Sequence, residues 1–452
     1  MSLSKNKLNF ITFGCWNEFY CNTKTPNNGL SLVMKALLDD EEIPEFYIVS
    51  GDNYYPKKED KSKKEDKSKK EDKSKKEDKS KKEDKEQSLS VESIARTITK
   101  DFLGITKYGK KKFFNNKDFE SGFSCLSNLL IKKKVPVYLL MGNHDLQYEN
   151  GLFDIIQHEK LLNGEVLTEK KLDKCTIINK QLSYVDSLDP DTKNFFKLGN
   201  YVKLFNENTS LLIFINSSFY TSNRQVLFDC FKKYRYSDIN LKDIDFLIKF
   251  EEYIIFSIVN SIKNNHNIKN VIIVGHEPIL TRRNKDIPIK TPLFVDGLKF
   301  INSLYDLFSD SNKYYICADV HQFQYGSIKL KIGSNTNNIN QYVVGTGGTT
   351  CDEDCPPNDA DYENILTDLP NEIELQFKLN KCERKFGYLK CYSDVNLNLK
   401  FKYVIVADCD TFKPIITDNL ISFGSEKSIK KSKKSKKSKK SKKSKKSKKS
   451  KK

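Results

Sequence analysis

The sequence predicts an α/β protein in which β-sheets pack between helices. Through most of the first 320 of its 452 residues, short apolar β-type runs alternate with patterns of helical spacing. From Ile328 to Val406 the chain consists mostly of short strand-like runs separated by polar turns. Five of the predicted strands end in small residues that are followed at once by Cys, Asp, Asn or His, which points to chemistry at the strand ends.

The elements follow from apolar spacing along the chain. Strands are expected where four to seven apolar or β-branched residues run together, and helices where apolar residues recur every three or four positions. The predicted strands are 10–13, 46–49, 135–141, 201–205, 211–215, 271–274 and 314–317, with 201–205 and 211–215 forming a hairpin. The predicted helices are 30–38, 91–102, 123–133 and 241–262.

The net charge of +18 lies in two low-complexity segments. Residues 57–86, a KKEDKS repeat, carry +4 and the Lys/Ser-rich residues 427–452 carry +17, so the remaining residues carry −3. Neither segment can bury apolar area, and we expect both to be disordered, as an insertion at 57–87 and a tail at 425–452. The tail either has no role beyond keeping the chain soluble, or it attracts nucleic acid or an anionic surface. Such binding would weaken as the salt concentration rises.

Composition also bears on the compartment. The first ten residues, MSLSKNKLNF, hold no apolar signal segment, and no apolar run approaches the roughly 18 residues that span a bilayer. The 11 cysteines are odd in number and show no paired spacing, so we expect mostly reduced thiols. These features predict an intracellular protein, cytoplasmic or nuclear, without a membrane span.

The polar residues at the strand ends form one candidate site. If the strands lie in one sheet, their carboxyl ends converge on one crevice. The chain has only five histidines, and three of them, His144, His276 and His321, fall at these ends. Such carboxylate, amide, phenolate and imidazole groups suit hard divalent or trivalent metals. Two such ions side by side can clamp a phosphoryl group.

In order, GDNYY (51–55), GNHD (142–145), GH (275–276) and the His of 318–321 resemble the calcineurin-like metallophosphoesterases. The pattern is most similar to small purple acid phosphatases of the tartrate-resistant type. The segments NFFKLGNYVKLF (194–205), LLIFINSSF (211–219), YVVGTGG (342–348) and FGYLKC (386–391) extend the resemblance over most of residues 8–410. It implies a four-layer α/β/β/α sandwich of two mixed β-sheets flanked by helices, over residues 1–424.

The resemblance also implies roles. Asp52 would bridge two metal ions, chosen from Fe, Zn and Mn. Tyr55 and His321 would bind the first ion, and Asn143 and His276 the second. His144 would lie near the phosphate of a small phosphomonoester that is attacked by a metal-bound hydroxide.

Two ligand positions differ from the family. Cys15 stands where the family has Asp, and Asp319 stands where it has His. If both still bind metal, the thiolate shifts the preference toward Zn and away from ferric iron. If they do not, one or both ions are lost. A cysteine-phosphatase mechanism is disfavoured, because the Arg it needs six residues after Cys15 is replaced by Cys21.

Three functions therefore stay open. The first is a metal-dependent phosphomonoesterase. The second is a catalytically silent binding or scaffold protein with the same fold. The third is a phosphodiesterase or nucleic-acid-associated protein recruited by its basic tail.

Overall fold

The computed structural model of the chain describes residues 6–55, 117–146, 174–188, 191, 193–234, 242–283, 291–352, 354–357, 360–363, 369–415 and 420–423. The predicted helix 91–102, the insertion 57–87 and the tail 425–452 lie outside the described residues. Disorder of the insertion and the tail, and a domain spanning 1–424, therefore stay predictions.

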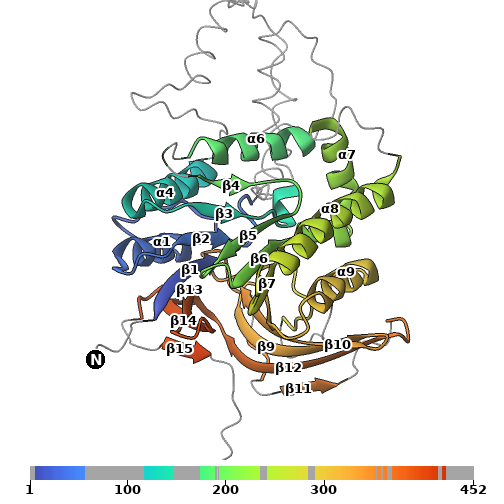
Figure 1. Cartoon of the computed structure of the whole chain (residues 1–452). Coiled ribbons are helices and arrows are strands. Elements are labelled where there is room, and N and C mark those ends of the chain that lie inside the picture. The colour runs from blue at the N-terminus through green and yellow to red at the C-terminus, as the bar shows by residue number, and fades with distance from the viewer. Residues whose placement is uncertain are drawn as a thin grey trace, which may run out of the picture.

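Two β-sheets form the centre of the fold (Figure 1). The seven-stranded sheet has the order β15-β14-β13-β1-β2-β3-β4, with β1 (Lys7–Phe13), β2 (Phe46–Val49), β3 (Val137–Leu139), β4 (Phe195–Phe196), β13 (Lys385–Ser393), β14 (Leu399–Asp408) and β15 (Leu420–Phe423). The eight-stranded sheet has the order β11-β12-β9-β10-β8-β7-β6-β5, with β5 (Tyr201–Phe205), β6 (Ser210–Phe214), β7 (Asn270–Val274), β8 (Asn312–Cys317), β9 (Phe323–Ile332), β10 (Asn335–Val344), β11 (Ala360–Glu363) and β12 (Ile373–Glu383). Both sheets mix parallel and antiparallel pairs.

Helices cover the outer faces of the sheets (Figure 1). The helix α1 packs on β13 and β14 and against α4, while α8 packs on β5 and α9 on β9 and β10. The described helices are α1 (Gly29–Asp39), α4 (Lys117–Lys133), α6 (Lys174–Asp186), α7 (Arg224–Tyr234), α8 (Ile244–Asn265) and α9 (Val295–Asp306), with short 3-10 turns η1 (His144–Leu146) and η2 (Ser217–Tyr220). The expected four-layer arrangement is therefore present.

The core between the sheets is aromatic. Phe10 and Phe46 from the seven-stranded sheet meet Phe205 from the eight-stranded sheet, with ring centroids 5.8 Å apart in both pairs. Alternate residues of the central strands face this core and the helices, so these strands are buried on both sides. That is why they appear in the sequence as continuous apolar runs.

The premise that these strand ends belong to a single sheet is wrong. The strands that precede Cys15, Asp52 and Asn143 are β1, β2 and β3 of the seven-stranded sheet. Those that precede His276 and Asp319 are β7 and β8 of the eight-stranded sheet. The ends still meet because the two sheets are joined there: Gly14 N donates to Val344 O at 3.0 Å.

The expectation of reduced cysteines is also wrong. Four disulfides join residues far apart in sequence, and only Cys15, Cys317 and Cys391 are free thiols among the 11 cysteines, all of which are described. The pairs are Cys21–Cys125, Cys175–Cys230, Cys351–Cys409 and Cys355–Cys382. Spacing could not reveal them, because the smallest separation is 27 residues. Since disulfides persist in oxidising compartments, the cysteines no longer support a reducing location.

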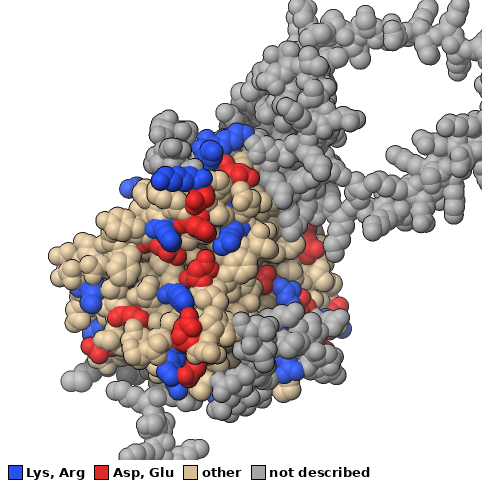
Figure 2. All heavy atoms as spheres, turned by 90° about the vertical axis from the view of Figure 1, so that its right-hand side faces the viewer, with Lys and Arg blue, Asp and Glu red and all other residues tan. Residues whose placement is uncertain are grey.

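Within the described residues, none of the helices combines the length and the apolar character needed to cross a bilayer. On the face turned toward the viewer in Figure 2, Lys and Arg side chains lie interspersed with Asp and Glu. No broad patch of one sign is visible among the described residues of that face, in agreement with the near-neutral charge outside the two Lys-rich segments.

Candidate metal centre

Three strands end in residues with left-handed backbone, and all three carry predicted metal ligands. Cys15 follows β1 with φ of 49°, Asp52 follows β2 with φ of 56°, and Asp319 follows β8 with φ of 56°. A left-handed conformation is uncommon outside glycine and costs free energy, and here it recurs after three strands at residues predicted as ligands. The tight turn before Asp52 needs glycine itself, since Gly51 has φ of 95° and a Cβ there would lie 2.4 Å from His276 Nδ1.

The first group of side chains, here called the Cys15 side, consists of Cys15, Tyr55 and His321 around Asp52. Asp52 Oδ2 accepts hydrogen bonds from Tyr55 OH at 2.8 Å and from Cys15 Sγ at 3.5 Å. The ligand atoms of Cys15, Asp52 and His321 all lie within 4.8 Å of one another. His321 Nδ1 is hydrogen-bonded to Thr350 O at 2.8 Å, which leaves Nε2 directed toward Tyr55 OH at 3.4 Å.

The second group, the His276 side, consists of His276 at the other oxygen of Asp52, Asn143 beside it, and Asp319, whose charge acts on His276. His276 Nε2 lies 3.3 Å from Asp52 Oδ1 and 3.2 Å from Asn143 Oδ1. The opposite ring nitrogen of His276 is held by Ser50 O at 2.7 Å. Such a backbone contact fixes the ring and leaves Nε2 free to bind a metal.

Asp319 lies in the same region but has another partner. Arg283 Nη2 donates to Asp319 Oδ2 at 3.0 Å, and Arg283 Nη1 lies 3.7 Å from Asp352 Oδ1. Arg283 was not predicted as a site residue. The carboxylate of Asp319 is therefore engaged by an arginine next to the predicted metal ligands.

His144 borders the Cys15 side. Its ring lies over Tyr55 with centroids 4.5 Å apart, and its backbone N donates to Asp52 Oδ1 at 3.1 Å. Its side-chain Nδ1 is buried without a hydrogen-bond partner among the described residues. The structure thus places a half-buried imidazole beside the predicted metal ligands.

The electrostatics of the Cys15 side suit a cation. Burial, with the nearby charges of Asp52 and Asp319, raises the pKa of Cys15, and burial with Asp52 raises the pKa of Tyr55. Burial also disfavours the charge on Asp52, but His276 and His144 outweigh it and its pKa is lowered. One buried carboxylate thus lies beside a thiol and a phenol that both hold their protons. Binding of a cation would displace these protons.

On the His276 side the histidine compensates Asp52. Burial alone would lower the pKa of His276, but Asp52 and Glu277 outweigh it and raise the pKa to about 9. A metal ion would replace that proton. The donors on both sides, one thiol, one phenol, two carboxylates, one amide and two imidazoles, fit one or two metal ions.

Two residues beside the ligands, Asn53 and Asp145, were not predicted as site residues. Asp145 Oδ2 accepts from Gly142 N at 2.8 Å, Asn53 N at 3.2 Å and Asn53 Nδ2 at 3.1 Å. Asn53 Oδ1 in turn accepts from Trp16 Nε1 at 3.1 Å. This network connects the loops after β1, β2 and β3. Its central carboxylate, Asp145, is the last residue of the motif GNHD.

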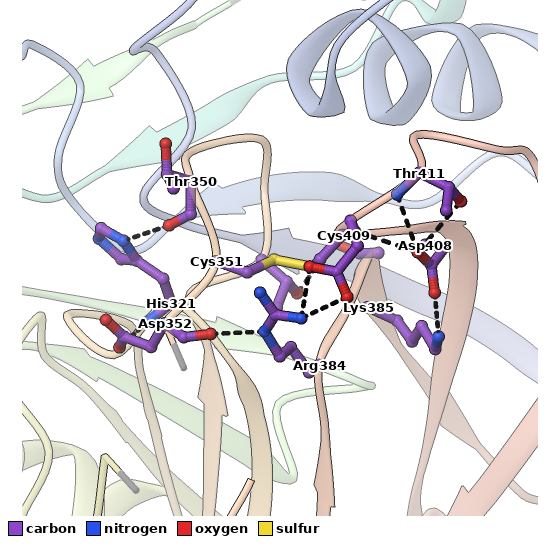
Figure 3. Close-up of a disulfide and its surroundings, with 12 residues drawn as sticks. His321, Thr350, Cys351, Asp352, Arg384, Lys385, Asp408, Cys409 and Thr411 are labelled. Atoms are coloured by element: carbon purple, nitrogen blue, oxygen red, sulfur yellow. Dashed lines mark hydrogen bonds and ion pairs between the residues drawn. A yellow bond between two sulfur atoms is a disulfide. The ribbon is translucent and has the colours of Figure 1, made fainter. Parts of the chain in front are cut away.

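The loop after β10 orients His321 (Figure 3). Thr350 O holds the His321 ring, and Asp352 Oδ2 accepts from His321 N at 2.9 Å. The loop is itself anchored by the Cys351–Cys409 disulfide and by Arg384, whose Nε donates to Asp352 O at 2.7 Å. The pairing of Cys351 with Cys409 could not be predicted from spacing, because 58 residues separate the two in the sequence.

Residues 109–323 match the family model described as calcineurin-like phosphoesterase. The predicted resemblance to the calcineurin-like metallophosphoesterases is confirmed. The matched region contains Asn143, His144, His276, Asp319 and His321 and leaves out Cys15, Asp52 and Tyr55. The fold brings the two sets into contact. Tyr55 OH lies 3.4 Å from His321 Nε2, and Asp52 Oδ1 lies 3.3 Å from His276 Nε2.

Two solved structures are similar at low identity. A purple acid phosphatase, PPD1, from yellow lupin (Lupinus luteus) seeds is 10% identical, with a TM-score of 0.40 over 93% of this chain and 54% of its own. PhoD is 11% identical, with a TM-score of 0.43 over 93% of this chain and 69% of its own. The chain thus spans about half the length of the lupin protein. No curated protein sequence matches this chain.

Proposed function

We propose that this protein is a metal-dependent phosphoester hydrolase that acts on phosphomonoesters. The observation that carries the proposal is the position of Asp52. One of its oxygens contacts Cys15 and Tyr55, and the other lies 3.3 Å from His276, so a single buried carboxylate joins two sets of donors. This is the arrangement needed to hold two cations close together.

The donors assign the residues that would hold each ion. Cys15, Tyr55 and His321 with Asp52 would hold the first, and Asn143 and His276 with Asp52 the second. When bound, such ions supply the positive charge that activates water and stabilises the phosphoryl group. The thiol makes the first position softer than a site of carboxylate and phenolate alone, which favours Zn over ferric iron.

His144 is the proposed proton donor to the leaving group. It is half-buried beside Tyr55, its Nδ1 has no partner within the described residues, and its backbone is fixed by Asp52. A positioned imidazole of this kind can act as a general acid.

A catalytically silent binding protein is the second candidate, favoured by the Arg283–Asp319 ion pair. A carboxylate engaged by an arginine is a weaker substitute for the imidazole of the family. The first ion would then be retained without an effective second one. The third function, recruitment to nucleic acid by the basic tail, depends on residues outside the described part of the chain.

The test is hydrolysis of an aryl phosphate monoester by the full chain, first freed of metal and then supplied with Zn, Mn or Fe. An Asp52→Ala variant tests whether activity needs the bridging carboxylate. Asp39→Asn is the matched control, since Asp39 is an exposed carboxylate paired with Lys35 on the surface of α1. The same assay with an aryl phosphate diester distinguishes a phosphodiesterase.

Metal-restored turnover that is lost in Asp52→Ala and kept in Asp39→Asn is the expected result. Activity equal to that of Asp52→Ala with every metal would overturn the hydrolase and favour the silent binding protein. Faster turnover of the diester than of the monoester would overturn the monoester assignment alone.

A further inference from the structure

Arg283 has a fixed backbone next to the candidate centre. It lies at the end of the segment that runs from β7 through His276. Two buried glutamines hold that segment, Gln341 on β10 and Gln322 directly before β9. Gln341 Oε1 accepts from Ile279 N at 2.8 Å, and Gln322 Nε2 donates to Arg283 O at 2.9 Å. Both glutamine side chains are buried. The course of the chain from His276 to Arg283 is therefore determined by the sheet.

The guanidinium lies between two carboxylates that border the metal ligands. Asp319 accepts from Arg283 Nη2 at 3.0 Å and is two residues from His321. Asp352 lies 3.7 Å from Arg283 Nη1 and also accepts from His321 N. These carboxylate side chains are only 13% and 22% exposed, whereas the Arg283 side chain is 42% exposed. The acids lie at the two terminal nitrogens of the guanidinium, one at each, and part of the arginine remains open to solvent.

The chemistry of an arginine in this position suits an anion. The guanidinium has five N–H donors in a planar fork, which matches the oxygens of a phosphoryl group. An ion pair exposed to this degree contributes little to the stability of the fold. Stability therefore does not explain well why buried glutamines fix the backbone of Arg283. Within the described residues, no lysine or other arginine is joined by an ion pair to Asp319 or Asp352.

We propose that Arg283 is a substrate-binding residue that contacts a phosphoryl oxygen on the Asp319 side of the centre. The proposal rests on the proposed hydrolase function and specifies it further. Asp319 then has a second role, because it holds the guanidinium in place. The substrate class this favours is a terminal phosphate carrying two negative charges, since a diester offers fewer anionic oxygens to the fork.

The experiment measures binding of inorganic phosphate by calorimetry, together with KM and kcat for an aryl phosphate, in the metal-loaded full chain. The variants are Arg283→Gln and Arg283→Lys, and the metal content of each is determined. Arg224→Gln is the matched control, because Arg224 is also a partly exposed arginine, 3.8 Å from Asp296 and 5.2 Å from the centre of the Phe294 ring.

We expect Arg283→Gln to weaken phosphate binding and raise KM roughly 10- to 100-fold, from the strength of hydrogen bonds to charged groups. Arg283→Lys should keep part of the affinity, and Arg224→Gln all of it. Phosphate affinity within twofold of the wild type in Arg283→Gln, at equal metal content, would overturn the proposal. If the wild type binds phosphate without turnover, the hydrolase fails while the binding measurement still decides the role of Arg283.

Discussion

The two sides of the candidate centre differ in how their predicted ligands are engaged. On the Cys15 side, the sulfur of Cys15 points at the shared carboxylate, 3.5 Å from Asp52 Oδ2. On the His276 side, the carboxylate of Asp319 is engaged by Arg283 at 3.0 Å. The availability of a candidate ligand thus depends on neighbours that lie elsewhere in the sequence.

The largest expected effect comes from removing the carboxylate that both sides share. Asp52→Asn keeps the size of the side chain but removes the charge, so both donor sets lose their common ligand. We expect turnover to fall at least about 1,000-fold, which corresponds to ~4 kcal/mol of transition-state stabilisation. Bound metal, measured by elemental analysis after gel filtration, should fall on both sides; unchanged metal content would contradict a bridging role.

The next effect separates the two sides. Cys15→Ala should cost roughly 100-fold in affinity for zinc at the first position, since a thiolate ligand is lost. Cys15→Asp should restore binding and shift the preference toward iron. Cobalt loading offers a spectroscopic check, because a sulfur-to-cobalt absorption band should be present in the wild type and missing in Cys15→Asp. Identical spectra of these two proteins would exclude Cys15 as a ligand.

A smaller effect is expected on the His276 side. Asp319→His introduces the imidazole of the family and releases Arg283. We expect affinity for the second metal to rise by about tenfold, the lower end of the effects seen when the ligand environment changes. Zinc titration with a chromophoric chelator measures it. Weaker binding would show that Asp319 itself is the better ligand in this protein.

The smallest effect concerns the loop that orients His321. Asp352→Asn removes the charge that accepts from His321 N and faces Arg283, and should raise KM by a few-fold at unchanged fold stability. Thermal unfolding serves as the check that the fold is kept. A large fall in Tm with unchanged KM would make Asp352 a purely structural residue.

Much of the fold could be predicted because its central strands are buried on both sides. β2 was predicted with its exact bounds, and α1, β7 and β8 to within two residues at each end, since apolar runs and helical spacing register burial directly. The division of the strands between two sheets could not be predicted, because an apolar strand carries no mark of the sheet it joins. Pairing between distant strands is decided by packing.

The site shows the same limit. Asp52, Asn143, His276 and His321 sit in motifs, and the structure brings them together with Cys15, Tyr55, His144 and Asp319. Arg283 and Thr350 could not be found in this way, because their roles exist only through contacts across 36 and 29 residues of chain. The disulfides escaped for a similar reason, since the cysteines of each pair are brought together by tertiary structure.

The four disulfides also set a problem for biosynthesis. Eight sulfurs alone allow about 105 pairings, and Cys15, Cys317 and Cys391 add competing thiols. All three free cysteines are buried in the finished fold, so they are shielded only after the chain has closed around them. Oxidative maturation must therefore leave Cys15 untouched during folding. We expect early zinc loading to raise the yield of correctly paired protein, because a metal-bound thiolate is a poorer partner for disulfide exchange.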